Sequence, residues 1–439
     1  MLLGICRMLE EVSLFDQEIK FTIGHAGTGK STELAKIVTE DDVVVTPTHK
    51  AARVLREKGI QNVTTIHALL KLVPTLNENF DPSKGHRMQR LKQMAGVDIA
   101  DIKVIYLDEY SMVSTKIFDL LLSMLPEGAV VHLFGDQWQL KPVDGEPIIP
   151  EDYSDDIHRL TTQYRADAPE IVETFERFVS FLDGSGELDL TLNKKIKKGT
   201  LKKFNPETDR ALAFTNERVQ ELNSEIAKVL KLPEDFEDGT PLSLNQIDCE
   251  WFDGASMSTK LYPTCITKGK LMEDDKLQIA SQKTSHDIEK YRQGSMLREF
   301  EEGKITIDNS IYSIHYDLNH YKTQQELKAN IEELQRFIFS THNIPSDTSL
   351  KQWCAENPHA EGVKERGKAW SRFLAHTNYV FSLQRPYATT VHKSQGSEFS
   401  TVYIAQEDLK KSIFRGFYGN YARLMYVSLS RAINKVVIV

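Results

Sequence analysis

Short apolar runs alternate with longer amphipathic stretches over the first 160 residues of the chain. The runs are rich in Val and Ile and predict strands at 19–23, 43–46, 104–108 and 130–135. Stretches typical of helices follow the first two runs, at 32–39 and around 51–58. Alternation of this kind predicts a parallel α/β sheet, in which ligands bind at the carboxyl ends of the strands.

The same alternation returns later, but its members are far apart in the sequence. Strand-like runs at 211–215, 401–405 and 435–439, with helix-like stretches at 217–230 and 421–430, predict a second α/β unit. A long insertion must therefore separate its two halves. The predicted domains are 1–160 for the first unit, 161–234 with 386–439 for the second, and 235–385 for the insertion.

The insertion at 235–385 has its own pattern. Alternating runs at 304–307 and 311–317 predict a β-hairpin, and apolar residues at helical spacing predict a helix over 324–340. The stretch 343–365 has a loop-like composition, and 370–381 predicts a further helix. We therefore expect a small β-barrel with a helical projection. A second insertion, polar and rich in turn residues, is expected in the first domain at 73–103.

Composition places the chain among soluble proteins. The 439 residues are 40% hydrophobic and 27% charged, and the apolar runs fall well short of the ~20 residues that span a bilayer. The four scattered cysteines and the weakly apolar start predict reduced thiols, no signal peptide and a cytoplasmic location, in the host if the chain is of phage origin.

The net charge of −9 argues against electrostatic coating of duplex DNA. Two basic stretches, 84–92 and 194–203, still leave room for a narrow positively charged groove, although such stretches are more often solvated faces.

A phosphate-binding loop directly follows the first predicted strand, with the sequence Gly-His-Ala-Gly-Thr-Gly-Lys-Ser-Thr at 24–32. Its glycines let the backbone N–H groups point at a polyphosphate, and the following helix adds a favourable dipole. Lys30 supplies a positive charge for the phosphates, and Ser31 supplies a hydroxyl ligand for Mg²⁺. The predicted nucleotide-binding residues of this loop are Gly24, Gly27, Thr28, Gly29, Lys30, Ser31 and Thr32.

Two acidic residues, Asp108 and Glu109, end the strand predicted at 104–108. One carboxylate at such a strand end can hold Mg²⁺, and its neighbour can deprotonate an attacking water. An isolated Asp-Glu pair is common on protein surfaces. Downstream of a phosphate-binding loop, we interpret the pair as catalytic.

Further segments occur in a fixed order along the chain. They are Val-Val-Thr-Pro-Thr-His at 44–49, Thr-Thr-Ile-His at 64–67, Gly-Asp-Gln-Trp-Gln-Leu at 135–140, Gln-Tyr-Arg at 163–165, Thr-Thr-Val-His-Lys-Ser-Gln-Gly at 389–396 and Tyr-Val-Ser-Leu-Ser-Arg-Ala at 426–432. With the phosphate-binding loop and the acidic pair, this set resembles the superfamily 1 helicases of the RecD/Dda branch. The resemblance covers nearly the whole chain, although 73–103 and 180–360 carry little of it.

The resemblance implies two RecA-like P-loop motor domains with ATP and Mg²⁺ in the cleft between them, and an SH3-like barrel inserted in the second. Ser31 and Asp108 would hold the metal, Glu109 would be the catalytic base, and Gln139 would sense the γ-phosphate. The catalytic residues implied in this way are Lys30, Asp108, Glu109, Gln139, Arg165 and Arg431.

The resemblance also assigns residues beyond the first motor domain. Arg165 and Arg431 would reach the γ-phosphate from the second motor domain, and Gly396 and Glu398 would touch the γ-phosphate and the ribose. Family members usually carry a Gln near the N-terminus that reads adenine, whereas Gln17 lies too close to the first strand to match. Base selectivity is therefore relaxed, or other residues hold the adenine.

Single-stranded DNA is the partner that the resemblance implies. Its contacts would come from Pro47, Thr48, His49, Thr65, His67, Thr390, His392 and Lys393. Hydroxyl and imidazole groups suit phosphates and sugars, so binding independent of sequence is expected. For each histidine, a hydrogen-bonded loop residue is an equally good interpretation.

Phe80 is the one aromatic residue in the insertion at 73–103, a region that forms a strand-separating pin in the resembled proteins. Stacking on a base is worth ~1–3 kcal/mol, and a base-pair step costs about 1.4 kcal/mol, so one wedge residue has the right magnitude. Packing of Phe80 within its own insertion is an equally good interpretation.

We predict an ATP-dependent, Mg²⁺-requiring helicase that moves 5′→3′ along single-stranded DNA, a direction that rests on the resemblance alone. It would act as a monomer at single-strand/duplex junctions, beside a single-strand-binding protein or replication and recombination proteins, and away from membranes. The alternatives are a motor that strips proteins without unwinding, an RNA helicase, and a nucleotide-gated binding module without turnover. The last is disfavoured because a switch has no need of Glu109 and the arginines.

Overall fold

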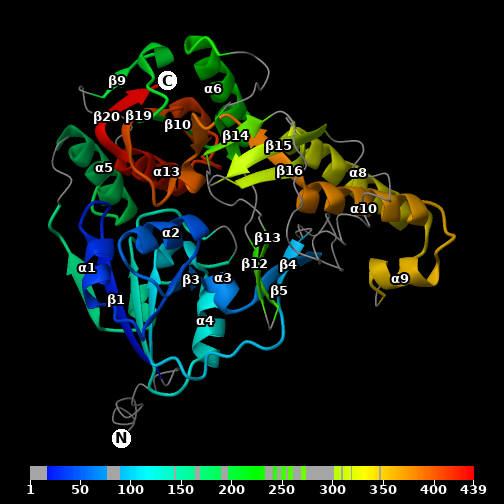
Figure 1. The fold of residues 1–439 in the computed structure, drawn as a ribbon, viewed down its shortest axis with the longest axis horizontal. Coiled ribbons are helices and arrows are strands. Elements are labelled where there is room, and N and C mark those ends of the chain that lie inside the picture. Colours follow the sequence, from blue (N-terminus) through cyan, green and yellow to red (C-terminus); the bar gives the residue numbers. More distant parts are fainter. Residues whose placement is uncertain are drawn as a thin grey trace, which may run out of the picture.

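The structure is a computed structural model that describes most of the chain. The described residues are 17–76, 89–142, 145–163, 169–188, 196–232, 241–244, 249–253, 256–260, 268–272, 301–307, 310–317, 319–345 and 348–439. Figure 1 shows two α/β domains, one above the other, with a mainly β and helical insertion extending to the side. Among these residues, no helix combines the length and apolar character needed to cross a bilayer.

The first domain is built on a six-stranded parallel sheet with the strand order β3-β2-β6-β7-β1-β8. Its strands are β1 (Glu18–Gly24), β2 (Val43–Thr46), β3 (Val63–Thr65), β6 (Val104–Asp108), β7 (Val130–Gly135) and β8 (Ile157–Leu160). Helices α1 (Lys30–Ile37), α2 (His49–Glu57), α3 (Ile66–Leu69) and α4 (Thr115–Met124) belong to this domain, as do the 3-10 turns Tyr110–Met112 and Pro150–Asp152. All four strands predicted in this part are confirmed.

Two strands of this sheet were missed because their patterns are weak. β3 has only three residues, and the two central residues of β8, His158 and Arg159, are exposed and polar. The central strands are buried on both faces, so Phe21, Ile105 and Leu133 are fully enclosed and give the apolar runs that the sequence displays.

The second domain contains a five-stranded parallel sheet with the order β18-β10-β19-β20-β9. Its strands are β9 (Lys197–Lys198), β10 (Arg210–Ala213), β18 (Ala388–Thr390), β19 (Phe399–Ile404) and β20 (Ala432–Ile438). Its helices are α5 (Pro169–Leu182), α6 (Asn216–Val229), α11 (Val391–Ser394), α12 (Gln406–Lys410) and α13 (Gly419–Ser430), with a 3-10 turn at Leu201–Lys203. The predicted second α/β unit is confirmed, although β9, β18, α5, α11 and α12 were not predicted.

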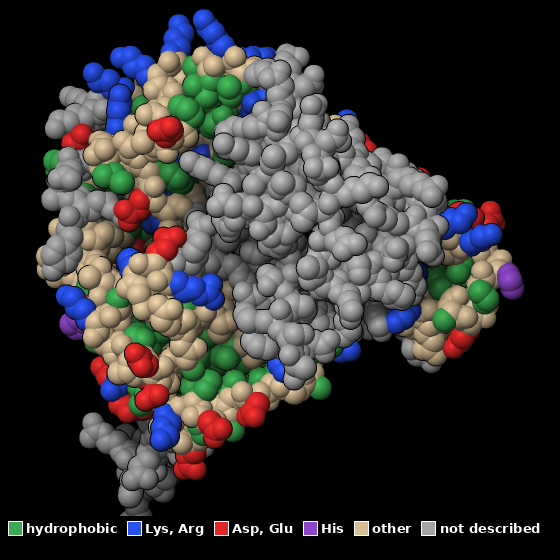
Figure 2. Space-filling view, viewed as in Figure 1, with side chains coloured by type: hydrophobic (Ala, Val, Ile, Leu, Met, Phe, Trp, Pro, Cys, Tyr) green, Lys and Arg blue, Asp and Glu red, His purple; other side chains and the backbone are tan. Residues whose placement is uncertain are grey.

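Helix α13 is buried along most of its length, from Tyr421 to Ser430, except for the half-buried Arg423. It packs on α5 and its residues also bond to loops of the first domain, so both sides of the helix need apolar or hydrogen-bonded side chains. The described part of the second basic stretch, 196–203, instead lies at an edge of the sheet around β9, where its lysines are exposed and Figure 2 shows Lys and Arg side chains gathered. This part of the chain is a solvated face.

The insertion contains a closed barrel formed by β11 (Pro241–Leu244), β14 (Lys268–Met272), β15 (Glu301–Ile307), β16 (Ser310–Asp317) and β17 (Val380–Gln384). A separate hairpin pairs β12 (Cys249–Asp253) with β13 (Ser256–Lys260). Helices α8 (His320–Thr341), α9 (Leu350–Glu356) and α10 (Val363–Tyr379) form the projection, in which α8 and α10 lie side by side (Figure 1).

Two predictions for the insertion were wrong in detail. The stretch expected to be a loop contains α9, which starts after Ser349 because its hydroxyl caps Gln352 N, and which packs Leu350 and Cys354 against Ile338. The last predicted helix begins earlier than expected and ends at Tyr379, since the following residues form β17 and close the barrel.

The insertion in the first domain is an antiparallel hairpin of β4 (Leu72–Leu76) and β5 (Gln89–Gln93). Phe80 lies between these strands, outside the described residues. The predicted boundary at 103 extends too far, because Ile99 is only 4% exposed and belongs to the core of the first domain.

Candidate functional site

A cavity of about 930 Å³ is lined by residues of both α/β domains. The predicted nucleotide-binding and catalytic residues that line it are Gly27, Thr28, Gly29, Lys30, Ser31, Thr32, Asp108, Glu109, Gln139, Gly396, Glu398 and Arg431. They come from the carboxyl ends of strands in the first domain and from the segments around β19 and α13 in the second. Arg165 lies outside the described residues.

Gly24 supports the loop without lining the cavity. A Cβ on Gly24 would lie 2.5 Å from Thr28 Oγ1 and 2.9 Å from the carbonyl oxygen of Leu160, so glycine is needed for the close approach of β8. Gly27 and Gly29 have positive φ angles of 86° and 84°, which only glycine adopts without strain. The loop therefore depends on all three glycines.

The ammonium group of Lys30 is held at the mouth of the loop. Its Nζ donates to the carbonyl oxygens of Gly24 at 2.6 Å and His25 at 2.8 Å, and the side chain is buried. The charge is thus fixed beside the N-terminus of α1, which begins at Lys30 itself. This placement suits a point charge that contacts phosphate oxygens.

Asp108 and Glu109 form an acidic pair at the end of β6. Asp108 is 4% exposed, and burial together with the charge of Glu109 raises its pKa to about 7, although Lys30 opposes the shift. Its Oδ1 accepts a hydrogen bond of 3.0 Å from Glu109 N. Glu109 adopts a left-handed conformation with φ 55° and ψ 42°, which is strained for a residue other than glycine.

This pair fits a divalent cation. The Oε2 atom of Glu109 is buried and has no hydrogen-bond partner within the described part of the chain. A cation bound to Asp108 would relieve the repulsion that raises its pKa. Ser31 and Asp108 offer the hard oxygen ligands that Mg²⁺ prefers. The described residues contain no cluster of three or more His, Cys, Asp or Glu side chains, so most ligands would come from phosphates and water.

The turn from Asp136 to Gln139 connects the two domains. Gln139 Oε1 accepts a hydrogen bond of 3.1 Å from Gln395 Nε2, and both side chains are almost fully buried. Arg423 Nη1 donates to the carbonyl oxygens of Gln137 at 2.6 Å and Gln139 at 2.7 Å. Sequence reasoning missed Arg423, since nothing in its local sequence signals a contact with a turn almost 300 residues away.

Arg431 lies at the boundary between α13 and β20 and is 4% exposed. Its Nη2 donates to Ser430 Oγ at 2.9 Å, and its Nη1 donates to the carbonyl oxygen of Ser397 at 3.4 Å. These contacts hold the guanidinium against the cavity wall. Arg431 and Lys30 therefore line the same cavity.

The threonines predicted to contact a single strand act as helix caps. Thr48, Thr65 and Thr390 accept hydrogen bonds from Ala51 N, Ala68 N and Lys393 N at 3.2, 3.1 and 3.3 Å. Thr65 and Thr390 are only 3% and 7% exposed, so burial leaves little of their side chains for a ligand. Pro47, Thr48, His67 and His392 are half-buried, Lys393 is exposed, and the side chain of His49 lies outside the described part.

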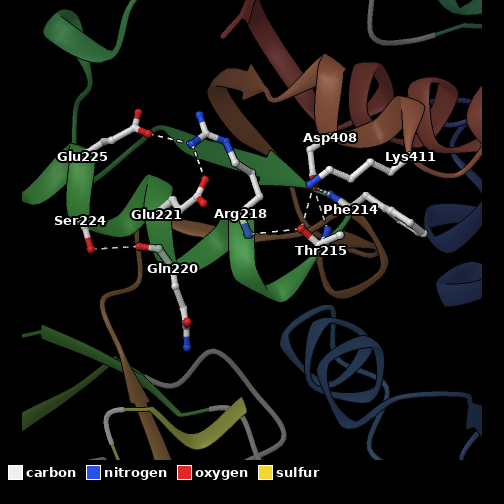
Figure 3. Close-up of polar contacts among 9 residues, drawn as sticks. All are labelled: Phe214, Thr215, Arg218, Gln220, Glu221, Ser224, Glu225, Asp408 and Lys411. Atoms are coloured by element: carbon white, nitrogen blue, oxygen red, sulfur yellow. Dashed lines mark hydrogen bonds and ion pairs between the residues drawn. The ribbon is translucent and has the colours of Figure 1, made fainter. Parts of the chain in front are cut away.

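Phe214, which the sequence analysis overlooked, accompanies His392. Their ring centroids are 6.1 Å apart, and burial lowers the pKa of His392. Figure 3 shows how Asp408 holds this region, accepting hydrogen bonds from Phe214 N and Thr215 N at 2.8 Å and from Thr215 Oγ1 at 2.9 Å. The end of β10 and helix α12 are thereby tied together.

Gln17 lies at the amino end of β1, away from the phosphate-binding loop. Its Nε2 donates to the carbonyl oxygens of Leu125 at 3.3 Å and Pro126 at 3.4 Å. Gln17 therefore stabilises the turn before β7 and is not placed to read a base in the cavity.

Two known families match parts of the chain. Residues 7–181 match the family described as AAA domain, and residues 386–439 match the family described as UvrD-like helicase C-terminal domain. The first range contains the phosphate-binding loop and the acidic pair, and the second contains Gly396, Glu398 and Arg431. Both walls of the cavity thus lie in recognised families.

The chain is also similar to individual proteins. The chain is 26% identical over 439 residues to the ATP-dependent DNA helicase dda of Enterobacteria phage T4, with 90% of this chain and 92% of that protein covered. It is 32% identical over 167 residues to the ATP-dependent RecD2 DNA helicase of Deinococcus radiodurans, covering 36% of this chain and 21% of that protein. The crystal structure of Bacteroides Pif1 bound to ssDNA has a TM-score of 0.48 and 16% identity, covering 96% of this chain and 88% of that chain.

Proposed function

We propose that this chain, a superfamily 1 helicase of the Dda/RecD type, hydrolyses ATP to move along single-stranded DNA and to separate the strands of a duplex. The cavity between the two α/β domains is the observation that carries the proposal. One wall holds Lys30 and the acidic pair, and the other holds Arg431, so a triphosphate bound there would be contacted from both domains.

When bound, Mg²⁺ would neutralise charge on the phosphates and help to orient them. Ser31 and Asp108 are the residues of this chain that would hold it. Glu109, next to Asp108, would orient and deprotonate the attacking water. Arg431, joined by Arg165, would stabilise the charge that develops on the transferred phosphoryl group, a role typically worth about 10³–10⁵ in rate.

Hydrolysis would be coupled to domain motion because the site is complete only when both walls are together. Gln139 would sense the γ-phosphate from the first wall while its side chain bonds to Gln395 of the second domain. A change at the phosphate would thus reach the segment 389–396 directly.

The single strand would run across the carboxyl ends of the strands, past the capped helices that begin after Thr48, Thr65 and Thr390. The hydroxyl oxygens of these threonines already accept hydrogen bonds from the helices. Contacts to the DNA would therefore be made by the threonine O–H groups as donors and by Pro47, His49, His67, His392 and Lys393. Such contacts reach phosphates and sugars, so binding would be independent of sequence.

Finer features belong to the same proposal. The β4–β5 hairpin would carry Phe80 as the strand-separating residue, and the five-stranded barrel would be of the SH3-like type. The motor domains would span 1–160 and 161–234 with 386–439. The chain would act as a monomer at single-strand/duplex junctions and move 5′→3′.

ATP hydrolysis with and without a single-stranded oligothymidylate tests the proposal, in wild type and in the Lys30→Ala variant. We expect strong stimulation by DNA and loss of turnover in the variant, because the loop loses its only fixed ammonium. Lys20→Ala is the control, since Lys20 lies in β1, the strand that precedes the loop, does not line the cavity, and pairs with Glu18 at 2.8 Å. It should hydrolyse ATP as wild type does.

Equal turnover with and without DNA would refute the motor. Stimulation by RNA in place of DNA would favour an RNA helicase, and stimulated hydrolysis without separation of a forked duplex would favour a translocase that strips proteins.

A further inference from the structure

Tyr426, near the middle of α13, reaches across the boundary between the α/β domains. Its hydroxyl donates a hydrogen bond to Asp136 Oδ2 and accepts one of 3.1 Å from Ala26 N in the phosphate-binding loop. Tyr426 is fully buried, and Asp136 is 1% exposed. Asp136 Oδ1 accepts from Trp138 N at 3.0 Å, so the turn that leads to Gln139 belongs to the same chain of hydrogen bonds.

The peptide groups of Ala26 are held from two directions. The Ala26 N–H bonds to Tyr426, and the Ala26 carbonyl accepts a hydrogen bond of 2.8 Å from Gln163 Nε2. Ala26 directly precedes Gly27, whose left-handed backbone begins the phosphate-binding turn. Because glycines leave this turn little conformational preference of its own, contacts to Ala26 set its position.

The ring of Tyr426 is fixed by packing that does not need the hydroxyl. Phe175 meets it edge to face with ring centroids 5.5 Å apart, and His25 does so at 6.2 Å. Phenylalanine would keep these contacts. It would leave the Ala26 N–H and one oxygen of the buried Asp136 carboxylate without this partner, which is costly in a site closed to water.

We infer that Tyr426 is a positioning residue for ATP hydrolysis: its hydroxyl links the phosphate-binding loop to the Asp136–Gln139 turn, and helix α13 carries that link to Arg431. The inference rests on the proposed function. Tyr426 lies five residues before Arg431, and Arg423, one turn earlier, holds the same turn through the carbonyl oxygens of Gln137 and Gln139. A movement of α13 with the second domain therefore moves the phosphate-binding loop, the Asp136–Gln139 turn and Arg431 together.

The hydrogen bonds of the Tyr426 hydroxyl affect the alignment of the catalytic groups more than the affinity for nucleotide. Phosphates would be gripped by Lys30 and by the N–H groups that follow Gly27, and none of these bonds to Tyr426. We therefore expect the Tyr426→Phe variant to bind ATP with a KM within about threefold of wild type. Its kcat in saturating single-stranded DNA should fall about 10- to 100-fold, the loss expected when a charge-assisted hydrogen bond is removed.

Tyr421→Phe is the matched control. Tyr421 lies on the same helix, is fully buried, and its hydroxyl accepts a hydrogen bond of 2.9 Å from Gln406 Nε2 within the second domain. This variant should keep the wild-type kcat, KM and stimulation by DNA. A merely structural role for tyrosine hydroxyls on α13 would affect both variants alike.

The experiment measures steady-state ATP hydrolysis with and without oligothymidylate, together with thermal unfolding of each variant. Asp136→Asn supplies the second test, because it weakens the same hydrogen bond and should lower kcat by a similar factor. The kcat of the double variant with Tyr426→Phe should be little lower than that of either single variant. If Tyr426→Phe unfolds too readily to assay, Asp136→Asn decides.

Wild-type kcat and DNA stimulation in a folded Tyr426→Phe variant would overturn the inference, as would additive losses in the double variant. Absence of DNA stimulation in wild type would instead refute the proposed function itself.

Discussion

The strain and repulsion at Glu109 predict that removing this carboxylate stabilises the protein while it abolishes hydrolysis. Glu109 is held with φ 55° and ψ 42°, and its Oε2 is buried beside Asp108. Two substitutions separate the causes. Glu109→Gln removes the charge and keeps a side chain that disfavours the left-handed region, whereas Glu109→Asn removes the charge and tolerates that region.

The magnitude follows from these two contributions. A buried charged atom without a partner costs about 1–3 kcal/mol, and an amide in its place carries no charge and no longer repels Asp108. A left-handed conformation costs an ordinary residue about 1–2 kcal/mol, part of which asparagine recovers. We therefore expect the free energy of unfolding to rise by about 1–2 kcal/mol for the Gln variant and about 2–3 kcal/mol for the Asn variant.

Thermal unfolding of the nucleotide-free protein at pH 7.5 measures this gain. Each kcal/mol corresponds to about 2–4 °C for a domain of this size. In the same preparations, ATP hydrolysis in the presence of single-stranded DNA should fall about 10²–10⁴-fold, the contribution of a general base. Glu127→Gln is the control, because Glu127 is an exposed residue in the turn between α4 and β7 and should change neither quantity.

Either of two results would refute the reasoning. Hydrolysis at the wild-type rate in the Gln variant would mean that Glu109 is not the base. Melting temperatures at or below wild type in both variants would mean that the acidic pair stores no strain.

Three further predictions concern stability. Gly24→Ala should destabilise the protein by about 1–3 kcal/mol and weaken nucleotide binding, because its Cβ meets Thr28 and the Leu160 carbonyl. Gly367→Ala in α10, which has open space around it, should instead stabilise the protein by about 0.5–1 kcal/mol. Equal melting temperatures of the two variants would contradict this prediction. Asp408→Ala should cost about 2–4 kcal/mol through three lost hydrogen bonds, whereas the exposed neighbour Glu407→Ala should leave stability unchanged, as denaturant unfolding would measure. Burial lowers the pKa of His132 to about 4, so the unfolded chain takes up a proton that the folded one does not as pH falls from 6.5 to 4. Because His132 is only half-buried and solvent screens part of this effect, stability should drop by about 1–2 kcal/mol over that window, and His132→Gln should flatten the profile of melting temperature against pH.

The strands and loops predicted correctly share one property: their signals are contiguous in sequence. A central parallel strand is buried on both faces, so β1, β6 and β7 appear as apolar runs, and the turn after β1 needs its glycines in adjacent positions. Elements that depend on partners were harder. β8 exposes its central residues, and β17 became a strand because the barrel requires a closing edge where a helical pattern continues.

The sequence by itself determined which polar groups line the first wall of the cavity, because Lys30, Ser31, Asp108 and Glu109 lie within short motifs whose spacing follows from a strand and a turn. Only the tertiary structure decided how the two domains are joined. Ala26 and Tyr426 are 400 residues apart, and Arg423 meets the Gln137 carbonyl across 286 residues. Hydrogen bonds between residues so far apart produce no periodic pattern in the sequence, since each partner alone resembles an ordinary loop or helix residue. They exist only once both sheets have formed and α13 lies between them.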